Sequence, residues 1–126
     1  LKPLEIDRIN SDFLLSYSSF SFFINHNGWR SRPKWIIHWE GVPHAFALWY
    51  PYLLAFDSSF IEIRHVESGE LLRVIIAENI RFLHASSQEI LYAYEDESGY
   101  DVVASLDFWD KTKKNRSRSA TITEIE

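Results

Sequence analysis

Short apolar segments recur along this chain at nearly constant intervals. They begin at Phe13, Tyr52 and Ile90, so that successive starts are 39 and 38 residues apart, and each has a small residue fourth and an aromatic residue fifth. A repeat of about 40 residues that contains several short strands is typical of a β-propeller blade. The pattern therefore predicts an all-β chain built from blades like those of WD-repeat proteins.

Segments rich in β-branched and aromatic residues fill most of the chain, and none of them has convincing helical periodicity. Such composition favours strands. Turn residues that tolerate a positive φ separate several of these segments, at Asn27-Gly28, Glu67-Ser68-Gly69 and Glu97-Ser98-Gly99. The strands expected on these grounds are residues 13–17, 20–25, 35–40, 44–49, 52–56, 60–66, 71–76, 80–84, 90–94 and 100–108.

The alternation of apolar and polar residues predicts which faces are buried. Ile61 and Ile63 alternate with Glu62 and Arg64, which indicates a strand with one wetter face near the outer side of a blade. The apolar segments at 13 and 52 are almost continuous, as expected for inner strands packed between blades. The small residues of the repeat, Ser16, Ala55 and Ala93, are then expected to face a neighbouring blade at close range.

The number of repeats bears on domain organisation. Three repeats are fewer than the four to eight blades with which propellers close, and the chain opens on Leu1 and contains no methionine. We therefore expect a fragment of about three blades, residues 1–110, from a larger and seven-bladed propeller. Residues 111–126 are rich in Lys, Arg, Ser and Thr and are expected to form a basic, flexible tail.

Charge and composition exclude several classes of protein. A net charge of −5, from 18 acidic and 13 basic residues, argues against a nucleic-acid-binding surface, and the absence of cysteine excludes thiolate sites and weakly favours a reducing compartment. The five cations of residues 111–118 occur without an anion. They suit an anionic membrane surface, an acidic protein partner or a solvated linker, and these three interpretations stay open.

Residues that could carry catalysis or bind a metal are present but are poorly arranged for either. Glu95, Asp96, Glu97 and Asp101 could suggest a propeller glycoside hydrolase, but they flank a predicted hairpin tip, where no apolar wall would shift a carboxyl pKa. The five histidines show no ligand spacing, and four glycines in the chain build no phosphate-binding loop. We therefore expect no catalytic residue, metal, cofactor or small-molecule substrate.

Several longer words resemble one known family. The run Pro51 to Leu71, continued by Glu78-Asn-Ile-Arg-Phe-Leu83, is similar to the C-terminal half of a citron homology (CNH) domain. Asn27-Gly-Trp-Arg-Ser-Arg-Pro33, Trp39-Glu-Gly-Val-Pro43 and the segment Glu89–Glu97 more narrowly resemble the CNH domain of fungal guanine-nucleotide exchange factors for Rho-type GTPases. The likeness covers about residues 4 to 109.

This resemblance implies a function. In such regulators of cell-wall integrity signalling, nucleotide exchange belongs to a Dbl-homology domain, and the CNH propeller is a protein-interaction module for a small GTPase or a membrane-proximal signalling protein. A cytoplasmic location with recruitment to the cell cortex or plasma membrane follows from it. A CNH propeller of a vesicle-tethering or kinase-type regulator is the alternative within the family.

One loop stands out as a candidate for binding a partner. Asn27, Trp29, Arg30 and Arg32 combine an Asn-Gly turn, a tryptophan and two arginines within six residues. Trp and Arg are enriched where binding energy concentrates at protein interfaces. The alternative is structural: the tryptophan closes over a blade edge and the arginines form ion pairs with neighbouring acids.

Overall fold

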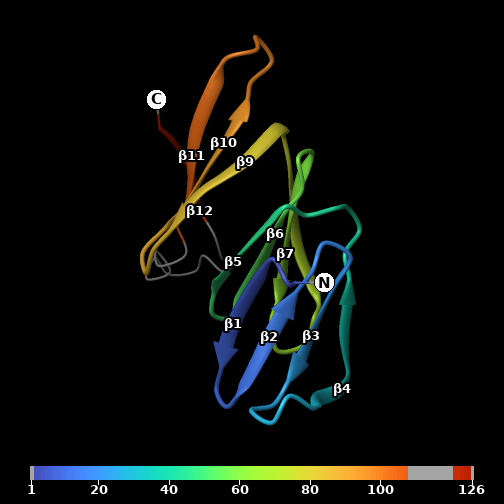
Figure 1. Cartoon of the computed structure of the whole chain (residues 1–126). Helices are drawn as coiled ribbons and strands as arrows, with labels where there is room; N and C mark the ends of the chain where they lie inside the picture. Colours follow the sequence, from blue (N-terminus) through green and yellow to red (C-terminus); the bar gives the residue numbers. More distant parts are fainter. Residues whose placement is uncertain (1, 108–120, 126) are drawn as a thin grey trace. The chain divides into compact units, whose positions relative to one another are not determined.

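A computed structural model of the chain describes residues 2–107 and 121–125. The described residues form strands and turns without a helix, and so offer no helix that could cross a membrane. The strands group into three antiparallel sheets of four, each in simple up-and-down order (Figure 1). This meander is the topology expected for a propeller blade.

The three sheets are called blades 1, 2 and 3. Blade 1 consists of β1 (Glu5–Ile9), β2 (Asp12–Ser16), β3 (Phe20–Ile24) and β4 (Arg30–His38). Blade 2 consists of β5 (Ala45–Trp49), β6 (Tyr52–Phe56), β7 (Phe60–His65) and β8 (Leu71–Ile76). Blade 3 consists of β9 (Glu78–Ala85), β10 (Ile90–Glu95), β11 (Asp101–Asp107) and β12 (Thr121–Ile125).

The recurring apolar segments form the second strand of every blade. They correspond to β2, β6 and β10, each of which pairs with a strand on both sides. Their small residues Ser16, Ala55 and Ala93 are all buried. The equivalence predicted from the 39-residue spacing is therefore confirmed, because each segment occupies the same place in its sheet.

The chain divides into two compact units. Unit 1 contains Leu1–Asp57 and Ile61–Ile75, and unit 2 contains Ser58–Phe60 and Ile76–Glu126. In unit 1 the core lies between blades 1 and 2, where Trp39 of blade 1 meets Phe46 of blade 2 with ring centroids 5.5 Å apart. Trp35 adds an edge-on contact with Phe23 at 4.7 Å and donates a hydrogen bond from Nε1 to the carbonyl oxygen of Val66. Aromatic side chains thus tie two neighbouring blades together.

The prediction that Glu62 faces solvent is wrong. Its side chain is buried, and Arg64 donates hydrogen bonds from Nε and Nη2 to its Oε1 at 3.2 and 3.0 Å. The backbone N–H of Glu40 donates to Oε2 at 3.0 Å. Burial of a carboxylate is tolerated where an opposite charge and hydrogen bonds replace water. An alternating pattern therefore marked the two faces of β7 but did not reveal that both faces are covered.

Two strands were not predicted, and one strand begins five residues earlier than predicted. β1 alternates charged and apolar residues, and β12 lies within the segment expected to be a tail, where it pairs with β11. Both segments form strands because a neighbouring strand offers backbone hydrogen-bonding partners. The composition of a segment does not reveal such a neighbour. β4 begins at Arg30 instead of Trp35, and its register with β3 shifts between Phe22 and Phe23, so that residues 32–35 bulge. The rest of the expected tail, including residues 111–120, lies outside the described residues.

Candidate functional site

Four turns gather at one end of unit 1. Because consecutive strands are antiparallel, the β1–β2, β3–β4, β5–β6 and β7–β8 turns lie at the same end of their blades. Contacts of Arg32 with both blades bring these ends together. We call this end, with its residues Asp12, Trp29, Arg30, Arg32, Tyr50 and Glu67, the turn face.

The tip of the β3–β4 loop is fixed by its own hydrogen bonds. The Asn25 side-chain oxygen accepts from the backbone N–H groups of Asn27 and Trp29 at 2.9 and 3.1 Å, and the Asn25 N–H donates to the Trp29 carbonyl at 2.8 Å. Gly28 has φ of +85°, a conformation open to glycine at little cost. The loop therefore holds its shape without help from a partner.

This loop presents Trp29 to solvent. The side chain is 73% exposed, although tryptophan is among the residues that gain most from burial. Arg30 is also exposed, and its guanidinium carbon lies 5.5 Å from the centre of the Phe22 ring. A large apolar ring and a cation on a preformed loop make a surface on which a partner can be bound without ordering the chain first.

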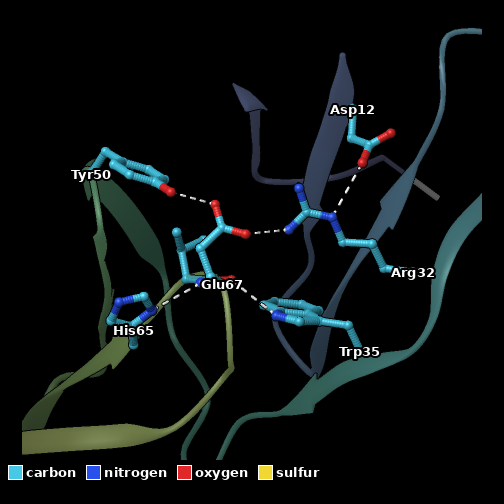
Figure 2. A network of polar contacts seen from close by, with 7 residues as sticks. Asp12, Arg32, Trp35, Tyr50, His65 and Glu67 are labelled. Carbon is cyan, nitrogen blue, oxygen red and sulfur yellow. Dashed lines mark hydrogen bonds and ion pairs between the residues drawn. The ribbon is translucent and has the colours of Figure 1, made fainter. Parts of the chain in front are cut away.

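Arg32 is used differently, although the sequence grouped it with Arg30. Its Nε lies 3.2 Å from Asp12 Oδ2 of blade 1, and its Nη1 lies 3.0 Å from Glu67 Oε1 of blade 2 (Figure 2). Its guanidinium carbon also lies 4.0 Å from the centre of the Phe23 ring. The Arg32 guanidinium is thus an ionic link between two blades, which is the structural alternative that the sequence left open for the arginines.

The β7–β8 turn supports this link from the other side. The Tyr50 hydroxyl donates to Glu67 Oε2 at 2.5 Å, and the Glu67 N–H donates to His65 Nδ1 at 3.2 Å (Figure 2). The hydrogen bond to Glu67 raises the pKa of Tyr50 above its ordinary value, because it stabilises the protonated phenol. Glu67 is therefore held by both a phenol and a guanidinium.

The structure brings together some predicted residues and adds others. Of Asn27, Trp29, Arg30 and Arg32, the first three are exposed, and the backbone of Asn27 is part of the hydrogen-bonded tip. Sequence reasoning missed Tyr50, whose side chain is 55% exposed on the same turn face. Tyr50 is 18 residues beyond Arg32, outside any shared motif, so no local signal could have placed it beside this loop.

The acidic cluster at the β10–β11 turn has structural contacts. Asp96 Oδ1 accepts hydrogen bonds from the backbone N–H groups of Ser98 and Tyr100, both at 2.9 Å. Asp101 forms an ion pair with Arg81 at 2.8 Å. These contacts fit the interpretation of the cluster as a hairpin tip. Within residues 2–107 and 121–125, no group of three or more His, Cys, Asp or Glu side chains is placed to hold a metal ion.

Comparisons with known proteins agree on one family. The model of the CNH domain family matches residues 1–86. Over 109 residues the chain is 62% identical to RHO1 GDP-GTP exchange protein 2 of Saccharomyces cerevisiae, an alignment that covers 86% of this chain and 8% of that protein. Over 84 residues it is 58% identical to Rho1 guanine nucleotide exchange factor 1 of Schizosaccharomyces pombe, which covers 66% of this chain and 6% of the relative.

A solved structure gives the same answer at the level of the fold. The AfRom2 CNH domain superposes with a TM-score of 0.83 and 65% sequence identity, over 86% of this chain and 35% of that domain's chain. The chain thus spans about a third of that structure and less than a tenth of the curated exchange factors that it matches. Its three four-stranded meanders are blades of a β-propeller, and the chain belongs to the CNH domain family.

Proposed function

We propose that this chain is part of the protein-interaction module of a guanine-nucleotide exchange factor, and that the module binds a Rho-type GTPase or a signalling protein associated with it. Support comes from the relatives, which are exchange factors or exchange proteins for Rho1 in two yeasts. Exchange itself is assigned to another domain of such a protein. We further propose a role in cell-wall integrity signalling, in the cytoplasm with recruitment to the cell cortex.

The location that we propose for the binding surface rests on a single observation, the exposure of Trp29. A side chain that is 73% exposed at the tip of a hydrogen-bonded loop gains little from folding and can still be buried against another protein. Arg30 beside it offers a planar cation for acidic groups on the partner. We therefore place the partner on the turn face, with Trp29 as its apolar anchor.

The chain supplies a matched control for this proposal. The tip Asp96–Tyr100 repeats the hydrogen bonds of Asn25–Trp29: the Asp96 N–H donates to the Tyr100 carbonyl at 2.9 Å, and the Gly99 N–H donates to the Asp96 carbonyl at 3.0 Å. Gly99 has φ of +86°, and Tyr100 is 72% exposed. An alanine at Tyr100 therefore removes an exposed aromatic side chain from the same kind of loop in a different blade.

The test is a binding measurement with the full-length protein. The variants Trp29→Ala, Arg30→Glu and Tyr100→Ala are compared for binding to purified Rho-type GTPase, in its GDP-bound, GTP-bound and nucleotide-free states, by calorimetry. We expect the first two to weaken binding by about tenfold or more, since anchors at interfaces are worth about 2 kcal/mol or more, and Tyr100→Ala to leave it unchanged.

Melting temperatures close to that of the parent protein are expected for all three variants, because each side chain is exposed. If the Trp29 and Arg30 variants bind as tightly as Tyr100→Ala, the partner lies on another surface. If none of the nucleotide states binds the parent protein, the assignment of a GTPase as partner is wrong.

A further inference from the structure

An open groove lies within unit 2. It has a volume of about 750 Å³ and runs between the residues that lead into β9 and the end of the β10–β11 hairpin. Its lining combines apolar and acidic side chains, among them Ile76, Glu78, Tyr94, Glu95, Glu97 and Val102. A space of this size accommodates a few residues of an extended peptide.

Both walls of the groove are held by backbone hydrogen bonds. On one side, the N–H groups of Ala77 and Ile80 donate to the carbonyls of Ser59 and Ser58 at 3.2 and 2.9 Å. On the other side, Asp96 caps the hairpin turn through the Ser98 and Tyr100 N–H groups. The shape is therefore present before any ligand arrives, which lowers the entropic cost of binding.

The groove has one strongly exposed apolar side chain. Ile76 is 82% exposed, the largest exposure among the large apolar residues described. Tyr94 and Val102 line the groove together with it and are only partly covered. Covering Ile76 with an aliphatic side chain removes apolar surface from water at about 25 cal/mol per Å².

The carboxylates around this apolar patch have no ion-pair partner among the described residues. In the part of the chain that the structure describes, no Lys, Arg or His forms an ion pair with Glu78, Glu95 or Glu97, in contrast to Asp101, which pairs with Arg81. Acidic side chains that line a concave surface add their fields, so the groove attracts cations and repels anions. An occupant must therefore be both basic and partly apolar.

We propose that this groove binds an extended basic segment of a partner protein, with an aliphatic residue of that segment against Ile76 and its Lys or Arg side chains beside Glu78 and Glu97.

The test uses a fluorescent synthetic peptide, rich in lysine and arginine with a central leucine, and the full-length protein. Anisotropy titration is expected to show saturable binding that weakens by about tenfold in the double variant Glu78→Lys with Glu97→Lys, since each reversed charge costs on the order of 1 kcal/mol or less at an exposed site. Ile76→Ser is expected to weaken binding severalfold without changing its salt dependence.

The matched control is the double variant Glu40→Lys with Glu70→Lys, which makes the same change in net charge at exposed positions of unit 1. Equal weakening in this control would reduce the interaction to non-specific charge attraction and overturn the proposal. The proposal is also overturned if the peptide binds Ile76→Ser and the Glu78 and Glu97 double variant as tightly as it binds the parent protein. Tighter peptide binding after neutralisation of the cations at 111–118 would assign the groove to the chain's own segment.

These outcomes do not depend on whether a partner binds the turn face. Loss of GTPase binding in Trp29→Ala with unchanged peptide binding separates the two surfaces. If the Glu78 and Glu97 double variant keeps the parent melting temperature but no longer binds the peptide, the result supports the groove and leaves the turn face untested.

Discussion

Replacement of Arg32 is the most informative perturbation of the turn face, because the sequence treats this residue as an exposed binding group and the structure makes it a link between blades. In Arg32→Ala, Asp12 and Glu67 lose their ionic partner at 3.2 and 3.0 Å, and Phe23 loses a cation 4.0 Å from its ring centre. The variant should therefore unfold more easily than the parent domain.

The magnitude follows from the exposure of the groups involved. The side chains of Arg32, Asp12 and Glu67 are 23%, 19% and 34% exposed, so each ion pair is partly screened and is worth about 1 kcal/mol. The cation–π contact adds about 1 kcal/mol in a partly buried setting. We expect Arg32→Ala to lower the free energy of unfolding by about 2–3 kcal/mol and Arg30→Ala by less than about 1 kcal/mol, since Arg30 is exposed.

The backbone of Arg32 provides an internal control. Its φ of +48° lies in the left-handed region, which costs a residue with a Cβ about 1 kcal/mol relative to glycine. Arg32→Gly should therefore be more stable than Arg32→Ala, the reverse of the usual order in a strand. Urea unfolding of the complete CNH domain measures both. Equal stability of the Arg30 and Arg32 alanine variants, or a less stable glycine variant, would refute the reasoning.

Three further changes test the interior. Glu62→Leu leaves the guanidinium of Arg64 without its carboxylate and should lower the free energy of unfolding in urea by about 3–5 kcal/mol. The added change Arg64→Met should restore part of this loss. If it restores none, the ion pair with Arg64 is not what Glu62 contributes to stability. Ala55→Leu should cost about 1–3 kcal/mol by overpacking a fully covered site, and a melting temperature at or above the parent value would contradict the close packing of β6. Burial, together with the charge of Glu5, raises the pKa of Asp7 from 3.8 to about 7. Between these two pH values the folded state keeps a proton that the unfolded state releases, so the free energy of unfolding falls as the pH rises from about 4 to about 7. Asp7→Asn should flatten this dependence on pH and stabilise the domain at pH 8 by about 1–2 kcal/mol, a value reduced for the partial exposure of the carboxyl group. The measurement is thermal melting at pH 5 and pH 8, and an equal change of melting temperature between the two pH values in the parent and the variant would contradict the prediction.

The sequence by itself determined the repeat and the strands that carry it. The apolar segments of β2, β6 and β10 are local and nearly continuous, and a strand buried on both faces needs such a run whatever its neighbours are. Turn residues are equally local: Gly28, Gly69 and Gly99 all adopt a positive φ, as the predicted turns require. The resemblance to CNH domains, which the comparisons confirm, also needed only the order of residues.

The tertiary structure decided the environment of individual charges. Glu62 and Arg32 are polar residues in ordinary alternating or loop sequences, and only their partners at Arg64, Asp12 and Glu67 show that they are part of the structural framework. Asp12 and Glu67 lie in another strand and another blade from Arg32. Arg64 lies in the same strand as Glu62, but the Glu40 N–H that also binds the Glu62 carboxylate comes from the segment after β4. The exposure of Trp29 and the place of Tyr50 were decided in the same way, because exposure depends on what the rest of the fold brings over a side chain. Local sequence determines how a segment prefers to fold, but contacts between distant segments determine which side chains remain free to bind a partner.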